Sequence, residues 1–154
     1  MNDDVHVDGD LHDVDGDGDL DVLSALHVDN QIAWYENMDG GGEVWTAHII
    51  SDKANDASSV FAIDVNGDGS MDVLSTSQGD NSVSWHENEL GNGTKWWTHG
   101  INVMDSRVSG PVSVYGIDVD GDGDADVLSA NKLDDTIAFH ENVFGNGFLW
   151  VLHE

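Results

Sequence analysis

The sequence repeats one unit three times, and this repetition restricts the fold more than any other feature does. The segment DVDGDGDLDVLSA begins at residue 13 and returns as DVNGDGSMDVLST at residue 64 and as DVDGDGDADVLSA at residue 118. The copies 13–48, 64–99 and 118–153 align over 36 positions without a gap, and 16 of these positions are identical in all three. Such a period is typical of stacked structural units, each of which covers the hydrophobic face of the next.

Each copy contains the signals of four short strands and no helical period. The segments DVLSA and IAWYEN, with their equivalents, are rich in β-branched and aromatic residues and are bounded by Gly, Asp and Asn. Glycines mark a turn before each W..H segment. A further strand-like segment leads into the acidic loop, SVFAIDV in the second copy and VSVYGIDV in the third. The first copy differs at this leading segment, where it has GDLH at 9–12. We therefore expect an all-β fold of three tandem four-stranded antiparallel units, each the size of a propeller blade.

The length of 154 residues suits one domain, and we expect a single β-repeat domain over 1–154. Its units are approximately 1–50, 51–104 and 105–154, and the connectors IISDKANDASS and INVMDSRVSGP are typical of surface loops. Propellers have about four to eight blades, so three blades cannot close a ring. We expect closure through oligomerisation, an open head-to-tail filament, or further blades of a longer chain.

The charge balance excludes several classes of partner. The chain has 31 Asp and Glu residues against 4 Lys and Arg, with a formal net charge of −27. Nucleic acids and anionic membrane surfaces both require basic patches, so neither is an expected partner. No apolar run approaches the ~18 residues of a transmembrane helix, so we expect no membrane insertion. No cysteine is present, and the first residues, MNDDVHVDGD, show no signal peptide.

The acidic loop that opens each copy has the pattern of a cation site. Oxygen-bearing residues occupy positions 1, 3, 5 and 9, position 7 offers a backbone carbonyl, and glycines at 4 and 6 allow a tight turn. Ca²⁺ takes 6 to 8 oxygen ligands at about 2.3 to 2.6 Å from carboxylates, carbonyls and water. The predicted ligands are Asp13, Asp15, Asp17, Asp19 and Asp21; Asp64, Asn66, Asp68, Ser70 and Asp72; and Asp118, Asp120, Asp122, Asp124 and Asp126.

The substitutions among the three loops favour a metal site over a merely solvated acidic loop. Position 3 changes only between Asp and Asn, position 7 accepts Ser, and positions 1, 5 and 9 are always Asp. An EF-hand would need a bidentate Glu at position 12, where this chain has Ser24, Ser75 and Ser129. Mg²⁺ is less suited, because it dehydrates reluctantly and seldom uses an all-protein site. The sequence therefore predicts three Ca²⁺ sites between strands.

Histidine, glutamate and tryptophan also recur at fixed positions, which raises an enzymatic interpretation. His48, His99 and His153 occupy one repeat position, and Glu36, Glu87 and Glu141 occupy another. Catalytic sites are seldom triplicated, whereas packing contacts between units recur in every unit. We therefore predict no catalytic residues and no enzymatic activity. We interpret Trp45, Trp96 and Trp150 as core residues of the blades, and the His and Glu residues as hydrogen-bonding groups at strand ends.

Two features are specific to the second copy. Trp97 has no counterpart in the other copies. It is a candidate ligand-binding residue, since an exposed Trp stacks on sugar rings. The alternative is that Trp97 forms a second packing face between units. Asn92 begins the sequence Asn-Gly-Thr and is a glycosylation candidate if the chain is exported by a glycosylating host.

The loop pattern D-x-D-x-D-G-x-x-D between strands, followed by DVLSA, IAWYEN and W..H, resembles the FG-GAP/VCBS repeats. These repeats occur in integrin α-subunit propellers, some fungal lectins and many secreted bacterial proteins. The resemblance implies propeller blades, calcium held in the first inter-strand loop, and an extracellular setting. Propellers of this family usually have about seven blades, whereas this chain supplies three copies of the unit.

These observations together predict a non-enzymatic, calcium-stabilised repeat protein with a structural or adhesive role. We expect it to be extracellular or at the cell surface, where calcium is near millimolar and fills such loops. The expected partners are further copies of the chain, in an oligomer or a filament, and a glycan or protein ligand. The alternative function is that of a propeller-type lectin.

Overall fold

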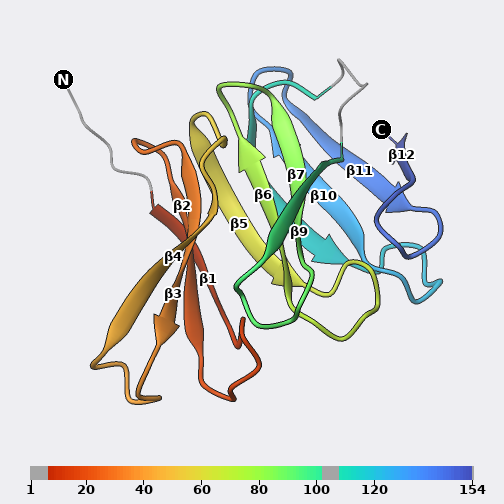
Figure 1. Cartoon of the computed structure of the whole chain (residues 1–154). Coiled ribbons are helices and arrows are strands. Elements are labelled where there is room, and N and C mark those ends of the chain that lie inside the picture. The colour runs from red at the N-terminus through yellow and green to blue at the C-terminus, as the bar shows by residue number, and fades with distance from the viewer. Residues whose placement is uncertain (1–6, 102–107, 154) are drawn as a thin grey trace.

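A computed structural model describes residues 7–101 and 108–153, which form twelve strands in three separate four-stranded antiparallel sheets (Figure 1). We call these sheets blades 1, 2 and 3 in chain order. In each blade the strands are hydrogen-bonded in sequence order, and no sheet is closed on itself. This confirms the all-β prediction of three propeller-type blades. The strands are β1 (Val7–His12), β2 (Asp21–Leu26), β3 (Gln31–Asn37) and β4 (Trp45–Ser51) in blade 1; β5 (Ala57–Ile63), β6 (Asp72–Ser77), β7 (Ser82–Asn88) and β8 (Trp96–Gly100) in blade 2; and β9 (Pro111–Ile117), β10 (Asp126–Asn131), β11 (Thr136–Asn142) and β12 (Trp150–His153) in blade 3.

The leading segment of the first copy forms a strand in spite of its unusual sequence. Strand β1 pairs with β2 along its whole length, from Val7 opposite Leu26 to His12 opposite Asp21. The carboxylate of Asp10 accepts a hydrogen bond of 2.9 Å from the backbone amide of Ala62 in blade 2. The polar residue that makes this segment atypical therefore helps to hold blade 1 against its neighbour.

The hydrophobic cores of the molecule lie between blades. The first strands β1, β5 and β9 lie alongside one another, while β4 and β12 lie toward the two ends of the array (Figure 1). One core joins blade 1 residues such as Leu23, Ile32 and Trp34 to blade 2 residues such as Val60 and Val73, all of them buried. A second core joins blades 2 and 3 in the same way. Each blade is thus stabilised mainly by burial against its neighbours.

The tryptophans that fill these cores are not the ones predicted from the sequence. Trp34 and Trp85 of the third strands are buried, whereas Trp45 at the start of β4 is 41% exposed. Trp96 and Trp150 are only partly buried and pack against a core from its edge. Trp96 and Trp150 face the preceding blade, whereas Trp45 lies on the outer face of blade 1 and stays exposed. The prediction that Trp45, Trp96 and Trp150 form blade cores was wrong in this respect.

The connectors between blades rest on the turns between second and third strands. Asn30 adopts a φ of 56°, and its side-chain oxygen accepts the amide of Asp56 at 2.9 Å. Asn81 repeats this with a φ of 57° and accepts the amide of Gly110 at 2.7 Å. These contacts hold each connector against a turn of the preceding blade. Within residues 7–101 and 108–153, no helix has the length and apolar character needed to cross a membrane.

Candidate metal sites in the acidic loops

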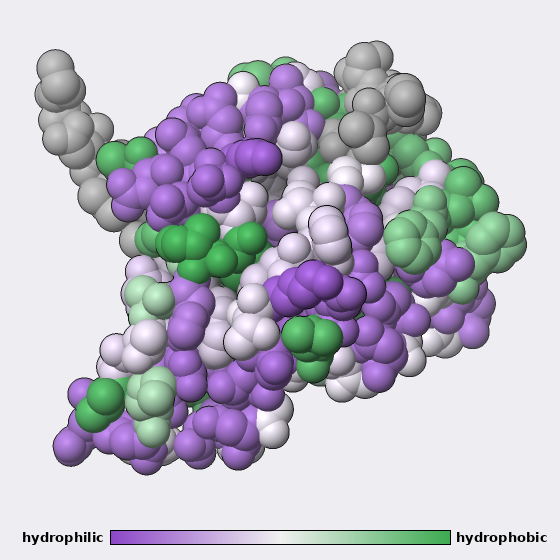
Figure 2. Space-filling view, viewed as in Figure 1, coloured by the Kyte–Doolittle hydropathy of each residue, from purple (hydrophilic) through white to green (hydrophobic). Residues whose placement is uncertain are grey.

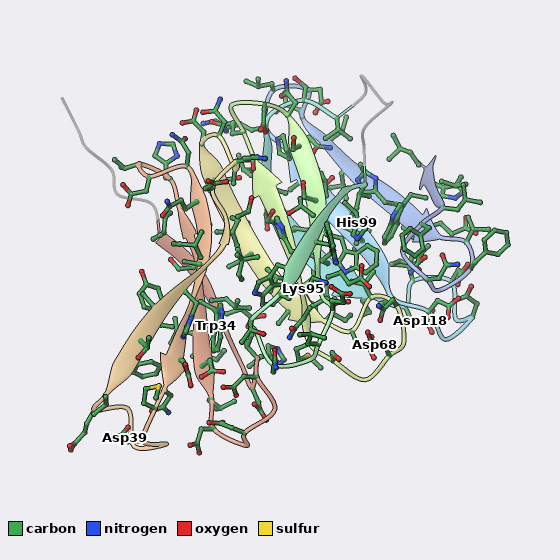
Figure 3. The ribbon with its side chains drawn as sticks, in the orientation of Figure 1. Trp34, Asp39, Asp68, Lys95, His99 and Asp118 are labelled. Atoms are coloured by element: carbon green, nitrogen blue, oxygen red, sulfur yellow. The ribbon has the colours of Figure 1, made fainter. Side chains whose placement is uncertain are left out.

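The three acidic loops join the first and second strands of each blade and lie at the same edge of the array (Figure 1). Figure 3 shows Asp68 and Asp118 on the second and third loops, beside the turns that follow β7 and β11. Because the blades repeat, each loop is placed in the same way relative to its own sheet. The position of the loop within its blade therefore recurs three times.

The first carboxylate of each loop forms its centre. Asp13 accepts the amide of Gly16 at 2.8 Å on Oδ1 and the amide of Gly18 at 3.0 Å on Oδ2. Asp64 and Asp118 make the equivalent pairs of bonds, at 2.7 to 3.0 Å. Gly16 and Gly18 have φ of 80° and 97°, a left-handed region that only glycine adopts readily. The glycines thus let the loop wrap around one carboxylate.

The carboxylates at positions 3 and 5 each stabilise the next step of the loop. Asp15 accepts the amide of Asp17 at 3.2 Å, and Asp17 accepts the amide of Asp19 at 2.9 Å. The third loop repeats both bonds, and in the second loop Asn66 and Asp68 take these roles. Each carboxylate oxygen has two acceptor sites, so an amide bond leaves one site for a cation.

The aspartate at position 9 connects the loop to the third strand of its blade. Asp21 is 1% exposed and accepts the amide of Val14 on one oxygen and that of Asn37 on the other, both at 2.9 Å. Asp72 and Asp126 are equally buried and make the same two bonds. Position 9 is therefore a structural residue as well as a candidate ligand.

Burial of Asp72 has a clear electrostatic consequence. Desolvation raises the pKa of this carboxyl to about 6, although hydrogen bonds from the Asn88 and Val65 amides lower it in part. The indole N–H of Trp85 also lowers this pKa by facing the carboxylate, without reaching hydrogen-bond geometry. The negative charge of Asp68 raises it further. An ionised Asp72 is thus costly in the folded chain unless positive charge lies nearby.

Two of the loops bring three carboxylates together. In the first loop, one oxygen each from Asp13, Asp15 and Asp21 lies within 4.8 Å of the others, and Asp118, Asp120 and Asp126 do the same in the third. The second loop has Asn66 at position 3, whose amide donates to Asp68 at 3.1 Å, so it lacks this third carboxylate. The predicted ligands at position 5, Asp17 and Asp122 in loops 1 and 3, lie outside these groups.

The side chains at position 7 point away from the loop centre. A Cβ on Gly40 would lie 2.5 Å from the Asp19 carboxylate, and one on Gly91 would lie 2.7 Å from Ser70 Oγ. Asp124 lies against Gly145 in the same way. These side chains therefore cover the turn between the third and fourth strands. This orientation is consistent with the sequence argument that position 7 offers only its backbone carbonyl.

The carboxylates at position 3 repel their neighbours. Desolvation, together with the charges of Asp17, Asp21 and Glu36, raises the pKa of Asp15, although the Asp17 amide lowers it in part. At Asp120 the Asp122 amide lowers the pKa, but desolvation and nearby carboxylates outweigh it, so this pKa is also raised. Oxygen-only groups of this kind are the donors that a hard divalent cation requires. The first and third loops could therefore each hold a metal ion.

The histidine and glutamate positions form pairs between the third and fourth strands. His48 contacts Glu36 at 2.8 Å, His99 contacts Glu87 at 2.9 Å, and His153 contacts Glu141 at 2.6 Å. Each histidine ring also stacks on the aromatic residue of the third strand, with centroids 4.5 to 5.1 Å apart. These contacts agree with the hydrogen-bonding role predicted for both residue types.

A buried histidine was missed by the sequence interpretation. His86 is 1% exposed and hydrogen-bonds Ser75 Oγ at 2.8 Å through Nε2 and Thr98 Oγ1 at 2.9 Å through Nδ1. Desolvation, followed by repulsion from His99, lowers the pKa of His86 to about 4, so the ring is neutral at pH 7. His140 makes the equivalent contact with Ser129 at 3.1 Å. The sequence signal was the recurrence of His at this position in the second and third copies, where the first copy has Tyr35.

The two candidates specific to the second copy lie on the surface of blade 2. Trp97 is 52% exposed, its indole N–H donates to Glu89 at 2.7 Å, and Lys95 lies 5.1 Å over its ring. The Lys95 and Trp97 hydrogen bonds lower the pKa of Glu89. Asn92 is exposed, and its side-chain oxygen accepts from the backbone amide and the hydroxyl of Thr94. Trp97 thus contacts groups of its own blade, and its ligand role stays a prediction.

Blades that carry an aspartate-rich loop between their first two strands define a class of β-repeat proteins. Residues 13–75 and 64–129 match the FG-GAP-like repeat, so the chain belongs to this repeat family. This confirms the resemblance found in the sequence. The search of curated proteins gave no match, and neither did the search of solved structures.

Proposed function

We propose that the chain is a non-enzymatic, calcium-binding repeat protein with a structural or adhesive role outside the cell. The observation that carries this proposal is the convergence of Asp13, Asp15 and Asp21, repeated by the equivalent residues of the third loop, in loops already ordered by their own amides. The FG-GAP-like repeat supports it, because the match covers all three loops. The three loops would take one Ca²⁺ each.

Calcium suits these loops better than magnesium does. The donors are carboxylate and carbonyl oxygens on a glycine-containing loop, and Ca²⁺ accepts 6 to 8 such ligands in irregular geometry. Mg²⁺ keeps its water shell and requires near-octahedral geometry. The second loop replaces one carboxylate by Asn66, and fewer ligand charges lower calcium affinity. We therefore expect the second loop to bind Ca²⁺ more weakly than the other two.

Bound calcium would stabilise the strands and the contacts between blades together. Asp21 links the first loop to β3 through the Asn37 amide. The Val14 carbonyl of the same loop accepts a 2.9 Å hydrogen bond from Asn88 of blade 2. An ion that fixes the loop therefore fixes an acceptor of the next blade. Binding free energy then contributes directly to folding free energy.

Thermal unfolding in calcium, in magnesium and in EGTA tests this proposal. We expect a higher unfolding midpoint in millimolar calcium than in EGTA, with little effect of magnesium. The variant Asp13→Asn should lose part of the calcium-dependent shift, because it removes the central carboxylate of the first loop. Asp52→Asn is the matched control, since Asp52 is an exposed connector residue outside the loops. Midpoints that do not differ between calcium and EGTA would refute the proposal.

A carbohydrate-binding role is the second candidate, and a cleft between blades 1 and 2 favours it. The cleft has a volume of about 410 Å³ and is lined by residues 49–54, from the end of β4 and the connector that follows it, and by hydroxyl-bearing residues of blade 2. The hydroxyl-bearing lining residues of blade 2 are Ser75, Ser77, Ser82, Ser84 and Thr98, and Ser51 of β4 also lines the cleft. Hydroxyl groups that both donate and accept are suited to a polyhydroxylated ligand.

A glycan array tests this second candidate on the wild type, on Ser84→Ala in the cleft, and on Trp97→Ala outside it. Loss of a glycan signal in Ser84→Ala alone would support binding in the cleft. Loss in Trp97→Ala alone would support stacking on the exposed tryptophan instead. An array without any bound glycan would remove the carbohydrate-binding role from consideration.

A further inference from the structure

The two interfaces between blades are built from the same contacts. The side chain of Asn88 donates to the Val14 carbonyl of the preceding blade at 2.9 Å, and Asn142 donates to Val65 at 3.0 Å. These four residues occupy two repeat positions, one on each side of the interface. The structure therefore uses one interface design twice, and the design is directional, with a different face on each blade.

Tryptophan and glycine form the second shared contact. A Cβ on Gly93 of blade 2 would overlap the ring of Trp34 in blade 1, with Cε2 at 2.9 Å. Gly147 of blade 3 lies equally close to Trp85 of blade 2, where a Cβ would meet Cη2 at 2.6 Å. Each third-strand aromatic ring is thus covered by the glycine turn of the following blade.

The outer face of blade 3 presents the first half of this interface, and among the described residues no other blade packs against it. Ile137 is 64% exposed, whereas its equivalents Ile32 and Val83 are fully buried. Val119 is 44% exposed, whereas Val14 and Val65 are each 1% exposed. Phe139 takes the place of Trp34 and Trp85 and is half-buried. Figure 2 shows hydrophobic residues gathered at the blade 3 end of the molecule.

The outer face of blade 1 presents the second half. Asn37 donates to the Leu20 carbonyl of its own blade at 3.2 Å, as Asn88 does to Met71. Within the described part of the chain, Asn37 makes no contact equivalent to that of Asn88 with Val14. Among residues 7–101 and 108–153, the Val119 carbonyl likewise accepts no such bond from an asparagine. Gly42 occupies the position of Gly93. A donor and its acceptor are therefore left open at opposite ends of one chain.

The blade 1 face also carries exposed apolar area. Trp45 is 41% exposed and Leu11 is 56% exposed. The residues equivalent to Leu11 are Ala62 in blade 2, which is 3% exposed, and Gly116 in blade 3, which is buried. This repeat position therefore lies inside both internal interfaces. Leu11 is larger than Ala62 or Gly116 and adds both apolar surface and volume to the outer face of blade 1. A contact through this face would therefore differ, at β1, from the two interfaces within the chain.

We propose that the outer face of blade 3 binds the outer face of blade 1 on a second copy of this chain. The contact is heterologous, since different surfaces meet, and it continues the interface design that the chain already uses twice. Two chains joined in this way at both ends supply six blades, which is within the range that closes a propeller. This proposal does not depend on which ion the loops bind.

Sedimentation velocity over a range of protein concentrations, in constant calcium, tests the proposal. We expect the wild type to reach at least twice the 16.6 kDa chain mass as concentration rises. Ile137→Asp and Leu11→Asp should each remain monomeric. Phe144→Asp is the matched control, because Phe144 is 68% exposed in blade 3 and its blade 2 equivalent Leu90 also stays exposed, at 59%. Circular dichroism melts verify that the variants fold.

A mixing experiment then tests the direction of the contact. A head-to-tail contact predicts that Ile137→Asp and Leu11→Asp form dimers when mixed, because one partner retains an intact blade 1 face and the other an intact blade 3 face. A contact between identical faces predicts no such rescue. Any of four results would overturn the proposal. The wild type could remain monomeric, Ile137→Asp could still associate, Phe144→Asp could fail to associate, or the mixture could fail to dimerise.

Discussion

Replacing Gly93 by alanine tests the packing between blades 1 and 2 most sharply. Gly93 has a φ of 67°, and an added Cβ would overlap the Trp34 ring, with Cε2 at 2.9 Å and Cη2 at 3.0 Å. Trp34 is 1% exposed within the first core, so its ring has little room to move. The substitution therefore adds a methyl group to a closed contact and forces alanine into a left-handed conformation.

The expected loss of stability has two parts that a control separates. A left-handed conformation costs alanine about 1–2 kcal/mol, and overpacking a buried contact costs about 1–3 kcal/mol more. Gly42 holds the same turn position in blade 1, with a φ of 76°, but an added Cβ would lie 3.6 Å from the nearest atom, in Trp45. Gly42→Ala therefore carries the backbone cost alone, about 1–2 kcal/mol.

Urea unfolding in millimolar calcium measures both variants, at chain concentrations where the transition does not depend on concentration. We expect Gly93→Ala to lose about 1–3 kcal/mol more free energy of unfolding than Gly42→Ala, at an unchanged m-value. Equal losses in the two variants would show that Trp34 and Gly93 are not closely packed. That result would refute the close contact between the Trp34 ring and the Gly93 turn at the interface of blades 1 and 2.

Two further predictions concern the buried polar groups. Because burial lowers the pKa of His86 from 6.5 to about 4, the unfolded chain binds more protons between these values, and acidification through them should cost about 3 kcal/mol of stability. The raised pKa of Asp72 has the opposite effect on stability, so the wild type alone does not isolate the His86 contribution. We therefore expect the free energy of unfolding to fall less between pH 7 and pH 4.5 in His86→Gln than in the wild type. An equal fall in the two proteins would contradict the role of His86. Asn88→Ala should lose about 1–3 kcal/mol more than Asn37→Ala in urea unfolding, because only Asn88 satisfies the carbonyl of Val14 in another blade. Equal losses would show that this bond contributes nothing to the interface.

The strand order and the loops were predictable because the chain repeats itself. Identities at the same offset in three copies fix which segments are equivalent, and glycine and aspartate mark the ends of each strand. Even β1, whose sequence departs from the other leading strands, takes its place through pairing with β2. Position in a repeat therefore overrides the local strand propensity of the GDLH segment.

The faces of the strands were not predictable in the same way. Trp34 and Trp45 lie in neighbouring strands of one blade, and both recur as aromatic residues in each copy. Only the packing of one blade on the next decides that Trp34 is buried and that Trp45 stays exposed on the outer face of blade 1. Repeat identity shows that both positions matter, but not on which side of the sheet each side chain lies.

The candidate metal sites were predictable in composition but not in their internal division of roles. The spacing of the loop pointed to the side chains of Asp13, Asp15, Asp17 and Asp21 and to the backbone carbonyl of Asp19 as ligands, without ranking them. The structure groups Asp13, Asp15 and Asp21, and it gives Asp21 the further task of holding the Asn37 amide. This contact joins residues 16 positions apart, so it depends on the pairing of strands and not on the loop pattern.

Calorimetric titration of the calcium-free chain with Ca²⁺ tests the central claim most directly. We predict saturable binding of one ion per loop, with the second loop weakest because Asn66 replaces a carboxylate. Asp13→Asn, Asp64→Asn and Asp118→Asn should each weaken or remove one of these binding events and leave the other two. Titrations without saturable binding, or with the same binding in all three variants, would contradict the assignment of the loops as calcium sites.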